Sequence, residues 1–150
     1  MKRYVIIAIL LAALPALCWG ATAATKETIG VIRNSSGTVS VTRGEQVLPA
    51  VSGTKLLAED VLDTGRDGSA GIILRDNSSL SIGPDSRLVL EKFLFAPVEG
   101  RFALLVRVSR GTMAYISGLI GKLSPGSARF ETPVATIGIR GTKFAVKVDD

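Results

Sequence analysis

The sequence predicts an all-β fold: a single domain made of many short strands. From Thr38 onward, apolar residues alternate with polar ones, which is the period of a strand with one buried face. Turn-forming residues interrupt this alternation every few positions. No convincing helical period occurs after residue 23. A β-solenoid, a β-sandwich and a small barrel all leave such a pattern, and periodicity alone does not choose among them.

Residues 1–23 are predicted to be a signal peptide. Lys2 and Arg3 precede an apolar stretch, and small residues follow it up to Ala24. This order is typical of a secretory leader. The stretch over residues 4–19 has 16 residues, fewer than the roughly 20 that span a membrane. Cleavage is therefore favoured over a retained anchor, and we expect the mature chain to lie in the periplasm without a stable membrane span.

Cleavage is expected after Ala23 or after Gly20, and either cut removes Cys18, the one cysteine of the sequence. The mature domain must then hold together by packing and backbone pairing without disulfides. Loss of the leader lowers the Lys and Arg count from 18 to 16 against 13 acidic residues, a net charge of +3. These charges are spread along the chain, so we expect no nucleic-acid partner.

Strands and turns then follow one another to the end of the chain. We divide it into an N-terminal β segment, residues 24–54, and a β domain, residues 55–150. Turn signals stand at residues 43–45, 76–79, 83–86, 97–100 and 124–127. The alternating apolar positions between them are Val39, Val41, Ala70, Ile72, Leu74, Leu80, Ile82, Leu88, Leu90, Phe102, Leu104, Val106, Val108, Met113, Tyr115, Phe130, Phe144, Val146 and Val148.

The residues that usually carry catalysis are scarce. The sequence has no histidine, and the mature chain lacks cysteine, so the commonest general base, the thiolate nucleophile and the usual transition-metal ligands are missing. Asp76 and Asp85 stand in turn signals, where a turn-forming role is favoured over an acid–base role. The segment 63–68 lacks the alternating ligands of a calcium loop. We expect no catalytic, metal-binding or cofactor-binding residues.

The dipeptide Arg-Gly recurs at positions 43, 110 and 140, and a threonine follows it at 112 and 142. We expect Gly141 to allow a chain corner. Arg140 is expected either to pair with Glu131 or Asp149 or to face a partner's acidic group. Pro133 has no amide donor and is expected at the start or edge of a strand.

The end of the chain resembles the closing segment of the FecR domain family. The residues that carry this resemblance are Thr132, Pro133, Arg140, Gly141, Thr142 and Phe144. Segments 61–64, 69–83 and 109–112 resemble earlier parts of the family pattern in the same order, so that the resemblance covers residues 55–148. It implies a stand-alone exported β module, and it favours a solenoid-like β roll over a sandwich or barrel.

The best-known FecR proteins relay outer-membrane iron-transport signals to a cytoplasmic sigma factor. Only three residues precede the apolar stretch here, so we expect a role confined to the periplasm. The resemblance and the poor catalytic set together indicate a non-enzymatic protein-binding or sensing module in an envelope signalling or assembly complex. Its expected partner is another envelope protein, bound by pairing with an exposed strand edge.

The sequence gives weaker support to two other functions. A carbohydrate-binding or cell-wall-binding protein is suggested by the basic excess and by the Ser- and Thr-rich turns, although aromatic residues for sugar stacking are few. A hydrolase that uses carboxylates alone is disfavoured. The cluster of Phe93 and Phe95 is a candidate docking patch together with Arg140, but a core position is favoured for both phenylalanines.

Overall fold

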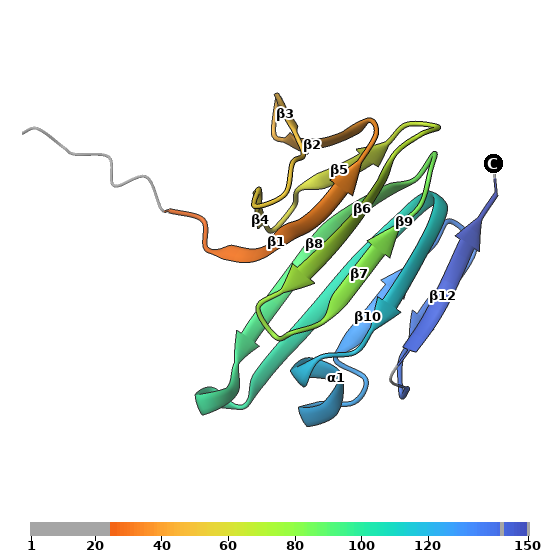
Figure 1. Ribbon diagram of the computed structural model, residues 1–150. Coiled ribbons are helices and arrows are strands. Elements are labelled where there is room, and N and C mark those ends of the chain that lie inside the picture. The colour runs from red at the N-terminus through yellow and green to blue at the C-terminus, as the bar shows by residue number, and fades with distance from the viewer. Residues whose placement is uncertain (1–24, 142, 150) are drawn as a thin grey trace, which may run out of the picture.

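The computed structural model describes residues 25–141 and 143–149 (Figure 1). The predicted signal peptide, residues 1–23, lies outside these described residues. The elements are β1 (Thr28–Ser36), β2 (Val39–Arg43), β3 (Gln46–Pro49), β4 (Lys55–Leu57), β5 (Val61–Thr64), β6 (Ser69–Leu74), β7 (Ser79–Ile82), β8 (Arg87–Ala96), the 3-10 turn η1 (Pro97–Glu99), β9 (Arg101–Ile116), α1 (Leu119–Leu123), β10 (Ala128–Glu131), β11 (Thr136–Gly138) and β12 (Lys143–Val148).

The strands form one curled sheet that is mostly antiparallel. Its main path runs β3-β2-β5-β8-β9-β7-β6-β1-β4, while β10 and β12 branch from β9 and β11 continues from β10. The expected all-β single domain is confirmed. The preference for a solenoid-like roll stays a prediction.

The long strand β9 is the reason that the sheet encloses a core. Its first part, residues 101–110, pairs with β8 on one side, and residues 104–107 pair in parallel with β10 on the other. Its last part, residues 111–116, pairs with β12 and, from residue 113, with β7. One strand therefore belongs to both layers of the curled sheet (Figure 1). The core side chains lie between the two layers.

Gly111 lies where β9 changes partners. Its φ is +86°, a left-handed conformation that favours glycine. A Cβ at this position would stand 2.1 Å from Ser86 Oγ. That hydroxyl oxygen accepts a hydrogen bond from the backbone N–H of Thr112 at 2.9 Å. The local structure thus explains the glycine of the Arg-Gly-Thr sequence at 110–112, which allows the left-handed conformation, and the backbone of the threonine binds Ser86.

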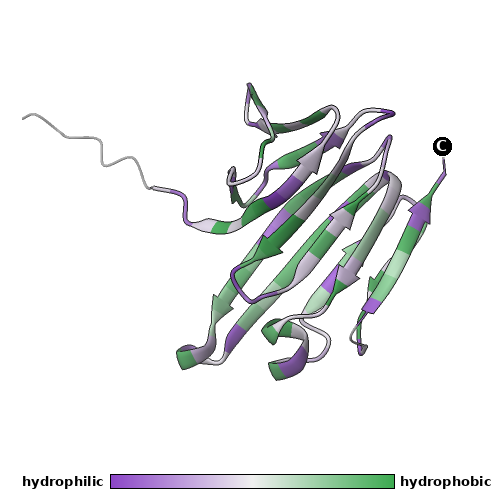
Figure 2. Cartoon of the chain, in the orientation of Figure 1, coloured by the Kyte–Doolittle hydropathy of each residue, from purple (hydrophilic) through white to green (hydrophobic). Residues whose placement is uncertain are grey.

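The core consists of the alternating apolar positions that the sequence indicates. Along the strands, hydrophobic and hydrophilic residues follow one another in turn (Figure 2). At one end of the core, three aromatic rings from three strands pack together: Tyr115 of β9, Phe130 of β10 and Phe144 of β12. The ring centroids of Tyr115 and Phe130 are 4.7 Å apart and those of Phe130 and Phe144 are 4.8 Å apart. This cluster joins the two layers.

A β-bulge explains the Phe93–Phe95 cluster. The register between β8 and β9 shifts between Leu90 and Lys92, so that Lys92 pairs with Leu105 and Phe93 with Leu104. The bulge inserts one residue into the alternation and changes its phase. Phe93 and Phe95 consequently pack against the core and are half-buried.

The prediction that residues after 23 contain no helix is wrong for one short segment. The single helical turn α1 begins after Gly118, and its first amides are satisfied by a distant residue. Leu119 N donates to the Asp76 carbonyl at 2.7 Å, and Ile120 N donates to Asp76 Oδ2 at 3.1 Å. A five-residue helix is too short to leave a helical period in the sequence and depends on such tertiary support.

Candidate partner-binding seam

The free edges of β11 and β12 face the same opening in the curled sheet, which we call the seam. Within the described residues, β11 pairs with β10 and β12 pairs with β9, and each has no partner on its other side. An apolar cavity of about 280 Å³ lies at this seam. Its lining residues are Thr132, Pro133, Val134, Ala135, Ile137, Val146, Lys147, Val148 and Asp149.

A tight turn forms one wall of the seam. The backbone N–H of Thr132 donates to the Ala135 carbonyl at 2.8 Å, and the N–H of Ala135 donates to Thr132 Oγ1 at 3.0 Å. Pro133 lies in the turn directly after the end of β10, where no ladder hydrogen bond is required of it. The turn leaves Val134 almost fully in solvent, 92% exposed. Thr132 and Pro133 belong to the closing segment, and the turn that they begin therefore presents the apolar side chain of Val134 to the opening.

Strand β12 forms the opposite wall. Its side chains alternate in burial: Phe144, Val146 and Val148 are half-buried, whereas Lys143 and Lys147 are exposed. Phe144 fixes the strand to the core through Tyr115 and Phe130. Val146 and Val148 then reach the cavity. The alternation that the sequence indicates for this strand is confirmed.

Arg140 follows β11 and is exposed. The two carboxylates expected as its partners are engaged elsewhere: Glu131 Oε2 is 3.0 Å from Arg107 Nη2, and Asp149 Oδ1 is 3.0 Å from Lys147 Nζ. Among the described residues, neither carboxylate forms an ion pair with Arg140. The expected pairing of Arg140 with Glu131 or Asp149 is thus absent from the described part of the chain.

Gly141 differs from Gly111 although both follow an arginine. Its φ lies outside the left-handed range, and no heavy atom stands within 4 Å of where a Cβ would be. The corner expected at Gly141 therefore does not depend on a left-handed glycine conformation. Thr142 lies outside the described residues.

The three Arg-Gly pairs have different surroundings. Arg43 holds the buried carboxylate of Asp60 through two hydrogen bonds, Nε to Oδ1 at 2.9 Å and Nη2 to Oδ2 at 2.7 Å. The hydrogen bonding to Asp60, opposed by partial burial, raises the pKa of the Arg43 guanidinium. Arg110 Nη2 is 3.7 Å from Asp63 Oδ1. The repeat in sequence is thus not a repeat of one structural role.

Two of the predicted docking residues, Phe93 and Phe95, lie outside the seam cavity. Phe93 and Phe95 lie on β8 and pack against the core, with Phe95 beside Phe102 at a centroid distance of 6.0 Å. Sequence reasoning missed Val134 and Ile137 as seam residues. An apolar residue directly after a proline in a turn is a signal that could have pointed to Val134.

The family model described as FecR protein matches residues 60–150. This match covers more than half of the chain, including the seam and all of its lining residues. The chain belongs to the FecR protein family. No curated protein and no solved structure matches it.

Membership of the FecR family associates the chain with signalling. Proteins of this family are envelope-associated signalling regulators that act in complexes with other proteins, and the family is not known for enzymes. Among residues 25–141 and 143–149 of this FecR-family chain, no helix has the length and apolar character needed to cross a membrane.

Proposed function

We propose that this FecR-family domain is a non-enzymatic, periplasmic protein-binding module of an envelope signalling complex, and that it binds its partner at the seam. The partner contributes an extended segment that pairs with the free edge of β12, and its apolar side chains enter the cavity between β12 and the turn at residues 132–135. The observation that carries this proposal is the opening itself: a free strand edge beside an apolar cavity.

The other strands at the ends of the sheet and of its branches suit this role less well. Strands β4 and β11 have three residues each, and β3 has four, the last of them Pro49. Strand β12 has six residues and no proline. It therefore offers more backbone donors and acceptors than any of these three strands.

The charges along β12 favour a different chain over a second copy. Lys143 and Lys147 are both exposed on this strand. Two β12 strands paired edge to edge would bring these lysines together, and like charges on paired strands are destabilising. An extended segment that carries acidic residues meets no such repulsion.

Crosslinking from the seam in intact cells tests the proposal. A photo-reactive residue in place of Ala145, which is exposed on β12, should crosslink to one identifiable envelope protein. The same residue in place of Ser81, exposed on β7 with partners on both sides, should not.

Two exposed valines provide a matched pair of variants. Val134→Asp places a charge at the cavity and should reduce capture of that protein about tenfold, because about 1.4 kcal/mol of apolar contact is lost. Val98→Asp changes a fully exposed valine on η1 and should leave capture unchanged. Both variants should melt within about 2 °C of the parent, since neither side chain is buried. Undiminished capture by Val134→Asp would refute binding at the seam.

A further inference from the structure

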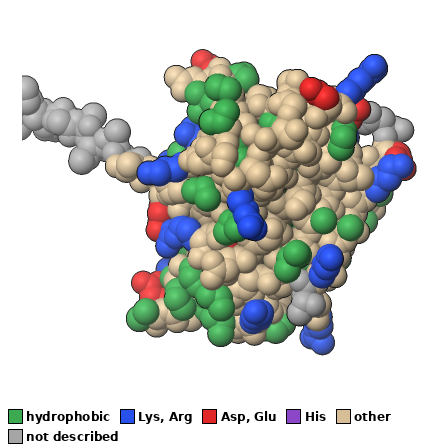
Figure 3. Space-filling view, viewed as in Figure 1, with side chains coloured by type: hydrophobic (Ala, Val, Ile, Leu, Met, Phe, Trp, Pro, Cys, Tyr) green, Lys and Arg blue, Asp and Glu red, His purple; other side chains and the backbone are tan. Residues whose placement is uncertain are grey.

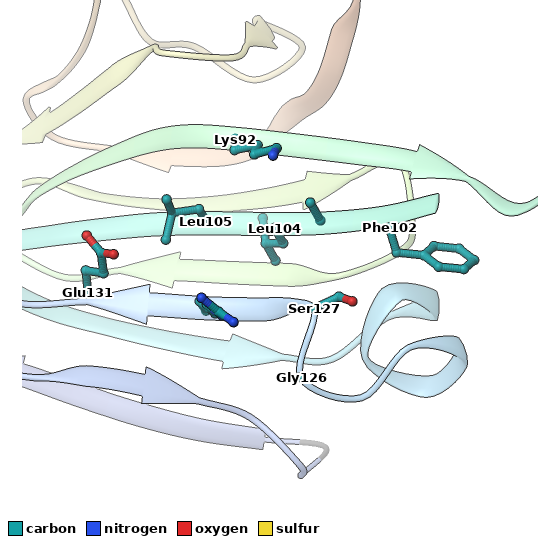
Figure 4. Close-up of a pocket in the computed structure, with 9 residues that line it drawn as sticks. Lys92, Phe102, Leu104, Leu105, Gly126, Ser127 and Glu131 are labelled. Carbon is teal, nitrogen blue, oxygen red and sulfur yellow. The ribbon is translucent and has the colours of Figure 1, made fainter. Parts of the chain in front are cut away.

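A second surface lies on the outer face of β8, β9 and β10, the face turned away from the core. A groove of about 360 Å³ crosses these strands, within the size range of small-ligand sites. Ala103 and Leu105 of β9 form its apolar floor, while Lys92 and Arg129 stand on the neighbouring strands. Phe102 lies at one end of the groove and Glu131 at the other (Figure 4). The groove is separate from the seam and shares no lining residue with it.

The pairing register places the two cations on either side of one leucine. Lys92 is the cross-strand neighbour of Leu105 in β8, and Arg129 is its neighbour in β10. Neighbouring strands lie about 4.8 Å apart, so the two backbones are roughly 10 Å apart. Both side chains are long and flexible enough to converge on one anionic group above Leu105.

The bulge in β8 is what brings Lys92 to this face. Leu90 is buried and Glu91 is half-buried on the outer side, so regular alternation would turn residue 92 inward. The extra residue of the bulge keeps Lys92 outward instead. Bulges are frequent beside binding sites because they re-aim a side chain in this way.

The acidic residues near the groove are paired with a cation other than Lys92 and Arg129. Arg107 Nη1 is 2.6 Å from Glu91 Oε1, and Arg107 Nη2 is 3.0 Å from Glu131 Oε2. One arginine thus holds both carboxylates. Lys92 and Arg129 form no ion pair within the described residues. On the face shown in Figure 3, basic side chains stand at several separate places.

We propose that this groove binds a small amphipathic anion, with its carboxylate or phosphate between Lys92 and Arg129 and its apolar part on Ala103 and Leu105. The planar guanidinium of Arg129 suits two parallel hydrogen bonds to such a group. The apolar floor supplies contact area that a simple inorganic anion cannot use.

Titrations followed by backbone amide chemical shifts test the groove, on protein expressed from the full-length sequence. The probes are octanoate, octyl phosphate, octan-1-ol and acetate. Octanoate or octyl phosphate should shift the amides of Ala103, Leu105 and Arg129, and the two probes distinguish a carboxylate ligand from a phosphate ligand. Octan-1-ol lacks the charge and acetate lacks the tail, so each should bind at least about tenfold more weakly.

Charge-removing variants complete the test. Lys92→Gln and Arg129→Gln should each weaken binding of the preferred probe about tenfold, while Arg33→Gln, an exposed cation on β1, should not. The proposal is overturned if octan-1-ol binds as tightly as both anions, if neither anion binds, or if the Lys92→Gln/Arg129→Gln double variant binds like the parent. Shifts confined to the seam would also overturn it.

Discussion

Asp76 shows how far the role of one residue can exceed its local pattern. The sequence indicates a turn former, and Asp76 does lie in the turn between β6 and β7. Its side chain is nevertheless fully buried. Its carboxylate accepts hydrogen bonds from Ser78 N at 3.0 Å, Ser78 Oγ at 2.6 Å and Ile120 N at 3.1 Å. A turn residue thus holds the start of a helix that lies far from it in the sequence.

Removal of the Asp76 side chain should be costly. Asp76→Ala leaves the N–H groups of Ser78 and Ile120 buried without acceptors, and we expect a loss of about 3 kcal/mol in the free energy of unfolding. Asp76→Asn keeps the shape and one acceptor oxygen, so it should lose about half as much. Urea denaturation measures both values. An Asp76→Ala protein within about 0.5 kcal/mol of the parent would contradict this role.

Tyr115 predicts a pH dependence. Burial raises the pKa of its hydroxyl above the ordinary value for tyrosine. Ser78 Oγ donates to Asp76, so the Tyr115 hydroxyl is the donor in its 3.0 Å contact with Ser78. A raised pKa means that the folded state holds this proton more tightly than the unfolded state. The resulting stability is complete below about pH 10 and is lost as the pH rises through the folded-state pKa.

Tyr115→Phe isolates this contribution. The variant should lose about 1 kcal/mol near neutral pH, because one buried hydrogen bond is absent. Its melting temperature should then fall less steeply than that of the parent between about pH 9 and pH 11. Parallel alkaline profiles for the two proteins would show that the Tyr115 proton is not linked to folding.

At the scale of elements, Gly111 controls the passage of β9 from one layer to the other. Gly111→Ala forces a side chain into a left-handed conformation and against Ser86, whose hydroxyl binds Thr112 N. We expect a loss of about 3 kcal/mol in the free energy of unfolding. Gly126 is the matched control, because its φ is +92° but no atom stands within 4 Å of where its Cβ would be. Gly126→Ala should lose only about 1 kcal/mol, and equal losses at both positions would rule out the contact with Ser86 as the cause.

Strands were more predictable than the other elements. The inward positions of β6, β7 and β9 follow from their period-two pattern, since one face of each strand is buried. The bulge in β8 could not be predicted from the sequence, because a residue inserted into an apolar run looks like an interruption of the period-two alternation. The helix α1 was not visible either, because its support comes from Asp76 across the fold.

At the scale of the whole molecule, the sequence predicted the fold class and singled out the closing segment. It did not predict the seam. The closing segment was identified by its residues, and the structure places Thr132 and Pro133 in the wall of the seam. Which edges stay free depends on which strands pair, and no local pattern encodes that β10 pairs in parallel with β9. The groove depends on the pairing register of β8, β9 and β10 and on the bulge in β8. The alternation of apolar and polar residues therefore could not predict it.

The sharing of β9 between the two layers also constrains the order in which the protein folds. Residues 111–116 acquire their neighbour on one side only with β12, which is the last strand among the described residues. A chain in which residues 143–148 have not yet joined the sheet would hold an unpaired edge in its centre. Completion of the fold thus requires residues 143–148, and their loss would expose the interior strand β9 to aggregation.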